Sequence, residues 1–162
     1  MNNTKATIRK ATIADVSRLV RMRWEHINIY NEYKRRPTVS YEQFEQSCSL
    51  FLHEGITSGR WVVFVAVINE VIVGHSYVQV IEKIPKPYSL EGAWGYVSNM
   101  YIEEPYRNHG IGTMLIDVLK AWAHEEKFEL LLLWPSEKST NFYARNGFSA
   151  ETKCMQYTIK ED

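Results

Sequence analysis

The sequence has little cysteine, which argues against a disulfide-stapled fold or a cysteine-rich metal site. Its two cysteines, Cys48 and Cys154, lie far apart, and neither belongs to a CxxC pair. A disulfide framework or a zinc knuckle needs several cysteines at short, characteristic spacings. His124 is followed by no second histidine at zinc-binding spacing. We therefore expect reduced thiols and no bound metal.

Long hydrophobic runs and an excess of one charge are also absent. The densest apolar run, residues 130–134, is far shorter than the ~20 residues that cross a bilayer, and residues 1–5 contain no apolar signal region. Nineteen basic residues balance nineteen acidic ones, so the net charge favours neither nucleic acid nor an anionic membrane. We expect a cytoplasmic protein with no membrane partner, and a nucleic-acid partner is not expected.

The sequence does contain enough apolar material for one folded domain. Of its 162 residues, 45% are hydrophobic and 13% are aromatic, and this length suits one domain better than two. No repeat, low-complexity segment or linker-like stretch divides the chain. We therefore expect residues 1–162 to form a single domain with a bulky core.

Two amphipathic helices are expected in the first third of the chain. Each begins with a capping-box pattern, Thr12 with Asp15 and then Ser40 with Gln43, and Gly55 is placed to end the second helix. Apolar stripes follow at helical spacing: Val16, Leu19, Val20, Trp24 and Ile27 in the first helix, and Tyr41, Phe44, Cys48 and Phe51 in the second.

Strand patterns dominate the rest of the chain. Residues 61–68 and 71–81 are expected to pair as a hairpin across a tight turn at Asn69 and Glu70. Further strands are expected at residues 7–10, 94–102, 128–134 and 148–159, a long helix after residue 110, and a short helix at 138–146 that Gly147 ends. The element order β-α-α-β-β-β-α-β-α-β predicts an α/β fold, a mixed sheet with helices on both faces.

A glycine-containing turn connects the strand at 94–102 to the long helix. A helix N-terminus offers unpaired N–H groups and a partial positive charge, which suit a phosphate. Glycine removes the Cβ atoms that hold a phosphate away from the backbone. The spacing excludes a Walker loop, which needs Gly-Lys-Ser/Thr, and a Rossmann turn, which needs a third glycine where Leu115 stands. The turn alone is also compatible with an ordinary strand-to-helix connection.

Three coinciding features resemble the GNAT superfamily of N-acetyltransferases. Arg107-x-x-Gly110-x-Gly112 matches the family's Arg/Gln-x-x-Gly-x-Gly/Ala motif, and an amphipathic helix and a buried strand follow it. The segment 141–148 then resembles the family's Phe/Leu-Tyr-x-x-x-Gly-Phe pattern. The element order agrees from about residue 7 to residue 159. The resemblance implies a GNAT-like mixed sheet whose central strands splay apart.

The resemblance also implies a place for acetyl-CoA, used as a co-substrate. The pantetheine arm is expected along one strand and the pyrophosphate at the turn: Asn99, Met100, Tyr101 and Ile102 in the strand, and Arg107, Asn108, His109, Gly110, Ile111, Gly112 and Thr113 at the turn. Two positions depart from the family pattern, since Glu137 stands where many members have Asn and Thr140 where many have Ala. These departures concern the short helix and leave the turn intact.

The expected chemistry is direct attack of an amine on the thioester. Tyr143 matches the family position of a general acid for the departing thiolate. At pH 7 only roughly one lysine-like amine in 10³ is neutral, so a base is needed for a basic acceptor. Glu91, Tyr96 and Ser98 lie where members place a base or a water-holding group. Among the histidines, His75 and His109 are weaker candidates.

The resemblance therefore implies an N-acetyltransferase acting on a primary amine of a small molecule or peptide. The alternative is a non-catalytic module that senses acyl-CoA. A toxin that acetylates aminoacyl-tRNA is disfavoured by the balanced charge. A homodimer is expected, with the C-terminal strand at its contact. Acceptor specificity is expected to lie in the loop at 84–94 and around the first helix, at Trp24, Glu25, Tyr30 and Tyr33.

Overall fold

The computed structural model describes residues 5–29, 36–150, 155 and 157. Its strands and helices follow one another in the order β1 (Thr7–Lys10), α1 (Val16–Ile29), α2 (Tyr41–Thr57), β2 (Trp61–Ile68), β3 (Val71–Glu82), β4 (Ala93–Ile102), α3 (Ile111–Glu125), β5 (Leu130–Leu132) and α4 (Thr140–Arg145). Short 3₁₀ turns stand before α1 (η1, Ile13–Asp15), between β4 and α3 (η2, Glu104–Tyr106) and before α4 (η3, Glu137–Ser139).

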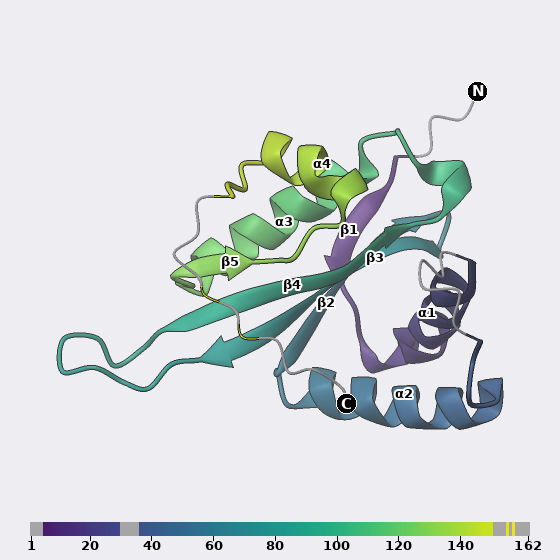
Figure 1. The fold of residues 1–162 in the computed structure, drawn as a ribbon, viewed down its shortest axis with the longest axis horizontal. Coiled ribbons are helices and arrows are strands. Elements are labelled where there is room, and N and C mark those ends of the chain that lie inside the picture. The colour runs from purple at the N-terminus through teal and green to yellow at the C-terminus, as the bar shows by residue number, and fades with distance from the viewer. Residues whose placement is uncertain (1–4, 30–35, 151–154, 156, 158–162) are drawn as a thin grey trace.

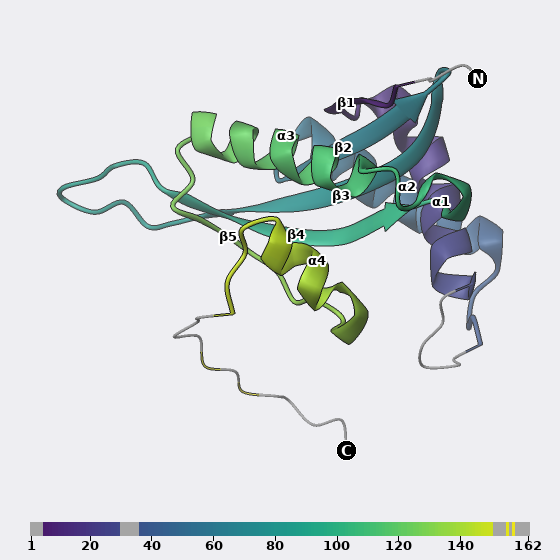
Figure 2. The ribbon, with the colours of Figure 1, turned by 90° about the horizontal axis from the view of Figure 1, so that it is seen from above.

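The strands form one mixed sheet in the order β1-β2-β3-β4-β5. The first four strands pair antiparallel, and β5 pairs parallel to β4. Helices α1 and α2 cover one face, while α3 and α4 lie against the other (Figure 1). The view from above shows α3 lying along the sheet, with α4 beside β5 (Figure 2). The predicted α/β fold with helices on both faces is confirmed.

Alternation along β2 divides the interior into two cores. Phe64 and Ala66 point toward α3, whereas Val63 and Val65 point toward α1 and α2. Successive side chains of a strand face opposite sides of a sheet, so a run of apolar residues is buried on both. This is why residues 61–68 lack a polar face.

Most of the predicted local signals are confirmed. The capping boxes at Thr12 and Ser40 both form. Asn69 and Glu70 both adopt positive φ angles, 47° and 66°, as a two-residue hairpin turn requires. Gly147 has a φ of 88° just after α4 and ends that helix as expected.

The prediction that Gly55 ends the second helix is wrong, because α2 continues to Thr57. Gly55 is buried, and a Cβ there would lie 2.8 Å from a Trp61 ring atom, so this glycine allows α2 to approach the sheet. The buried face of α2 also differs from the predicted one. Leu52 is buried and Phe51 is about half exposed, and on α1 Ile27 is 44% exposed.

The strand predicted to be central and buried is shorter than predicted, lies at the edge of the sheet that the described residues form, and has no buried residue. Residues 128–134 were expected to form it, but β5 contains only Leu130–Leu132. The strand expected at residues 148–159 falls mostly outside the described residues, and so does its expected contact in a homodimer. No helix in the described part of the chain is long and apolar enough to cross a membrane.

The start of α1 is held to β1 by an ion pair that gives the first testable prediction. Asp15 accepts hydrogen bonds from both terminal nitrogens of Arg9, at 2.7 and 2.9 Å, and from the Thr12 N–H at 2.7 Å. The guanidinium is the main cause that lowers the pKa of Asp15 from 3.8 to about 2. A lowered pKa means that this stabilisation is present above pH 3.8 and is lost as the pH falls through 2.

We predict that Asp15→Asn lowers the free energy of unfolding by about 1–2 kcal/mol at pH 7. The difference from the wild-type protein should disappear as the pH approaches 2. Denaturant unfolding at a series of pH values measures this, and Asp117→Asn serves as the control because Asp117 is an exposed residue paired with Lys120. A difference that stays constant from pH 7 to pH 2 would contradict the prediction.

Candidate active site

The gap between β4 and β5 is the feature around which the candidate residues gather. Only three residue pairs join the two strands, from Trp94 with Leu130 to Tyr96 with Leu132. Beyond Tyr96, β4 continues to Ile102 while the chain after β5 turns away and returns as α4 (Figure 2). Among the described residues, no strand pairs with this last part of β4 on the β5 side. Its main chain is therefore open to an added partner.

A bulge interrupts the same part of β4. Asn99 has a φ of 49°, and the pairing register between β3 and β4 shifts opposite it. Positive φ is uncommon for a residue with a side chain, although Asn tolerates it better than most. The Asn99 side chain accepts a hydrogen bond from Arg23 on α1 at 2.5 Å and donates one to Ser98 at 3.1 Å. The bulge is thus held by α1, which packs on the face of the sheet opposite to α3.

The turn between η2 and α3 presents a run of unpaired N–H groups. Asn108 and Gly110 both have positive φ, 63° and 78°. Within the described part of the chain, no N–H group of residues 108–113 donates a hydrogen bond to another residue. The first bond of the helix runs from the Met114 N–H to the Gly110 carbonyl. Unpaired donors at a helix N-terminus form an anion-binding arrangement.

Arg107 ties this turn to the end of β4. Its Nε donates to the Ile102 carbonyl at 2.9 Å, and its guanidinium lies over the ring of Tyr101 at 5.6 Å from the ring centre. The Ile102 carbonyl therefore already accepts one bond from the protein. The side chain of the motif's arginine therefore links the turn to the end of β4.

The two motif glycines serve different physical purposes. A Cβ at Gly112 would lie 3.2 Å from two ring atoms of Phe142 and 3.4 Å from Met100. Gly112 therefore allows α3 to pack against α4, and its expected role in clearing space for a phosphate stays a prediction. Gly110 has nothing within 4 Å of its Cβ position, so its surroundings are open.

Tyr143 lies beside the open part of β4. Its hydroxyl is 3.6 Å from the sulfur of Met100, the residue after the bulge. Its ring makes an edge contact with that of Phe142, which faces Gly112 instead. Burial raises the pKa of Tyr143 above its usual value, so the phenol keeps its proton at neutral pH.

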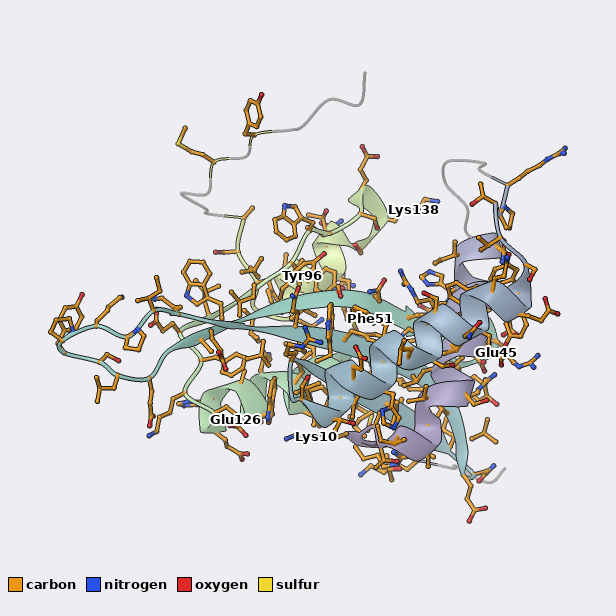
Figure 3. All side chains as sticks on the ribbon, turned by 90° about the horizontal axis from the view of Figure 1, so that it is seen from below. Lys10, Glu45, Phe51, Tyr96, Glu126 and Lys138 are labelled. Carbon is orange, nitrogen blue, oxygen red and sulfur yellow. The ribbon has the colours of Figure 1, made fainter. Side chains whose placement is uncertain are left out.

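The structure places Ser98 beside the bulge and Tyr96 at the last residue pair of the β4–β5 ladder. Ser98 lies next to the bulge and bonds to Asn99. Tyr96 is the last β4 residue paired with β5, and its ring meets that of Trp134 at 5.0 Å. Figure 3 shows Tyr96 on the body of the sheet, away from the hairpin tip.

Glu91 is not brought together with the other candidates. It lies before β4 begins, its side chain is 84% exposed, and it pairs with Lys127 at 3.8 Å. Ala93 and Met100 are separated by seven residues, which at ~3.3 Å per residue is roughly 20 Å. The carboxylate is therefore too far from Tyr143 to share a reaction centre with it in this structure.

On the α1 side of the bulge lie His75, which the sequence indicated only as a weaker candidate, and Tyr77, which sequence reasoning missed. His75 is fully buried, and its pKa is lowered to about 3, chiefly by burial, so it is neutral at physiological pH. The Asn99 carbonyl lies near it without good hydrogen-bond geometry. Tyr77 is also buried, and its hydroxyl has no partner in the described part of the chain. A histidine and a tyrosine at alternate positions of an apolar strand were the available signal.

Comparison with known proteins gives this arrangement a family. A family model described as the acetyltransferase (GNAT) family matches residues 23–148. The chain therefore belongs to the GNAT acetyltransferase family, and this membership implies acetyl-CoA-dependent acetyl transfer in general terms. The family suggested by the sequence is confirmed.

Solved structures support the fold. A predicted acetyltransferase from Clostridium acetobutylicum, crystallised with acetyl-CoA, is 23% identical with a TM-score of 0.76, over 95% of this chain and 96% of that one. A GCN5-related N-acetyltransferase from Ralstonia eutropha is 23% identical with a TM-score of 0.73, over 96% and 99%. An aminoglycoside acetyltransferase from an uncultured soil metagenomic sample is 18% identical with a TM-score of 0.74, over 99% of each chain.

The contact between Gly112 and Phe142 gives a prediction about packing. We expect Gly112→Leu to lower the melting temperature by several degrees, because the new side chain collides with the Phe142 ring. Phe142→Ala alone should also destabilise the protein by leaving a cavity. The double variant should recover part of the loss, because each change relieves the other. Thermal melts of the four proteins complete this cycle, and purely additive losses would contradict the contact.

Proposed function

We propose that this protein transfers an acetyl group from acetyl-CoA to a primary amine of a small molecule or peptide, in a ternary complex. The observation that carries the proposal is the run of unpaired N–H groups at residues 108–113, next to the open stretch of β4 and the Tyr143 hydroxyl. An anion site, an unpaired strand and a protonated acid together suit an extended, phosphate-bearing thioester.

Acetyl-CoA would be bound by the main chain. The pyrophosphate would accept hydrogen bonds from the N–H groups of residues 108–113, helped by the partial positive charge at the start of α3. The pantetheine arm would pair with β4 between Asn99 and Ile102, as an added strand does. The acetyl-CoA bound to the Clostridium acetobutylicum protein of similar fold supports this assignment.

The reaction would take place at the bulge. The amine nitrogen attacks the carbonyl carbon of the thioester, and an N–H group of β4 near Asn99 stabilises the negative charge on the carbonyl oxygen. The carbon–sulfur bond then breaks, and Tyr143 gives its proton to the departing thiolate. The extra proton of the amine passes to water, and the tyrosinate is reprotonated from solvent. Because only the catalytic reading needs a proton donor here, the Tyr143 position favours an enzyme over a sensor.

An acceptor screen tests the proposal directly. Acetyl-CoA is mixed with a library of amino acids, amino sugars, polyamines and short peptides, and the released thiol is measured. We expect thiol release that depends on the amine and mass spectrometry that finds the acetylated product. Tight acetyl-CoA binding with no transfer to any amine would favour the sensor instead. The homodimer stays a prediction, which light scattering tests.

A charge placed at Thr113 tests the anion site. Thr113 is exposed at the third position of α3. A glutamate there stabilises a helix N-terminus but repels a phosphate. We predict that Thr113→Glu keeps or slightly raises the melting temperature while weakening acetyl-CoA binding at least about tenfold. Thr113→Gln is the neutral control and should bind within about threefold of wild type. Calorimetry measures both, and equal affinities in the two variants would remove this turn from the cofactor site.

Replacing Tyr143 by phenylalanine tests the acid role. We predict that Tyr143→Phe lowers kcat by roughly 10²-fold, within the usual range for general acid catalysis. Acetyl-CoA affinity and melting temperature should stay close to wild type, because the ring and its contacts remain. Tyr157→Phe is the control, since Tyr157 is exposed and is not among the candidate catalytic or cofactor-binding residues. Full activity of Tyr143→Phe would exclude the acid role, and a parallel loss of stability would indicate packing.

A further inference from the structure

Three arginines on β1 and α1 bond to side-chain oxygens, but only two of them meet a carboxylate. Arg9 pairs with Asp15 at 2.7 Å, and Arg18 pairs with Glu103. The partner of Arg23 is the neutral amide oxygen of Asn99. Within the described part of the chain, no acidic side chain bonds to Arg23.

The charges near Arg23 are of its own sign. Burial is the largest cause that lowers the pKa of His26, and the positive charges of Arg23 and Arg107 lower this pKa further. Arg18 and Arg23 act in the same direction on the buried His75. Two nearby carboxylates have other partners, because Glu45 accepts a hydrogen bond from the Tyr41 hydroxyl and Glu103 is bound to Arg18.

Such an arrangement favours the binding of an anion. Arg23 is half-buried, so part of its hydration is lost without a counter-charge in exchange. A guanidinium has five N–H donors, and here one of its terminal nitrogens bonds to Asn99. The remaining donors can hold a carboxylate or a phosphate in a two-point contact.

The position of Arg23 shows which molecule would carry that anion. Its bond to Asn99 places the guanidinium at the bulge, one residue before Met100, whose sulfur meets the Tyr143 hydroxyl. Arg23 approaches from the α1 face of the sheet. The proposed phosphate site, at the start of α3, lies on the other face. An anion at Arg23 therefore belongs to the molecule that meets the thioester from the α1 side.

We propose that Arg23 is a specificity-determining residue that binds an anionic group, a carboxylate or a phosphate, on the amine acceptor. The inference rests on the proposed acetyl transfer and names the chemical class of its acceptor. An amino acid, a peptide with a free terminal carboxylate or an amino sugar phosphate fits this description. A polycation such as a polyamine does not, because it would meet Arg23 and Arg107 with charge of the same sign.

The same cations help the amine to react. Positive charge near an ammonium group disfavours its charged form and lowers its pKa. A larger fraction of the bound acceptor is then the neutral amine that attacks the thioester. This effect supplies part of what a carboxylate base would provide, and it does not depend on Glu91.

Matched acceptor pairs test the inference. Each pair shares an amine and differs in the anion: amino acids against their amides, and glucosamine 6-phosphate against glucosamine. We expect kcat/KM to be at least about tenfold higher for the anionic member of a productive pair. Amidation lowers the pKa of the neighbouring amine, so a larger fraction of the amide is the neutral nucleophile and its intrinsic reactivity is higher. A preference for the carboxylate must therefore come from binding.

Two variants assign this preference to Arg23. Arg23→Gln keeps a donor for Asn99 but removes the charge, and it should raise KM for the anionic acceptor at least about tenfold. KM for the neutral partner and KM for acetyl-CoA should change less than about twofold. Arg21→Gln is the control, because Arg21 is exposed on the same helix and lies over Tyr41; it should leave the preference unchanged. Arg23→Lys keeps the charge and should retain part of the preference.

Several outcomes would overturn the inference. Equal kcat/KM values for both members of every pair would do so. An equal loss of kcat/KM for both acceptors in Arg23→Gln would also do so, because Arg23 would then only support the bulge. A higher Kd for acetyl-CoA alone would assign Arg23 to a cofactor phosphate. If no amine is acetylated, the proposed function fails instead. Calorimetry of the same pairs on protein loaded with coenzyme A then still decides whether the anionic member binds more tightly.

Discussion

The early end of the β4–β5 ladder is the constraint on which the candidate site depends. Three residue pairs hold the strands together, and the contact there is close, since a Cβ at Gly95 would lie 2.6 Å from Leu131. Beyond this point the two chains separate, and β4 is left with main-chain groups that no described strand satisfies. Unpaired backbone groups are costly unless water or a ligand pairs with them. A long ladder would fill the gap where a cofactor arm is proposed to lie.

The bulge at Asn99 joins the two faces of the sheet at that gap. On the α3 face, Met100 reaches Tyr143 and the Gly112–Phe142 contact. On the α1 face, Asn99 bonds to Arg23. A regular strand places consecutive side chains on opposite faces, and the bulge keeps Ser98 and Asn99 close enough to bond to one another. One irregular residue thus relates the proposed acid, the proposed cofactor strand and the proposed acceptor anion.

Local signals in the sequence identified much of this arrangement correctly. A strand followed by a glycine turn and an amphipathic helix specifies a helix N-terminus, and the N–H groups there are unpaired for reasons of helix geometry alone. Capping boxes, the Asn69–Glu70 turn and the stop at Gly147 depend on residues within a few positions of each other. These features are fixed by local backbone preferences, so the sequence suffices to predict them.

Long-range contacts decided the rest. Gly55 was predicted to end a helix, but its lack of a side chain lets α2 approach Trp61. Gly112 was predicted to clear space for a phosphate, and in the folded chain it also accommodates Phe142. Glu91 and Tyr143 are both candidates for catalysis in the sequence, and the length of β4 keeps them apart in the structure. The sequence by itself determined the order of the described elements, the turn and the family, because these rest on local spacing. The tertiary structure alone decided which charges lack a partner, because Arg9, Arg18 and Arg23 differ only in what the folded chain brings to them.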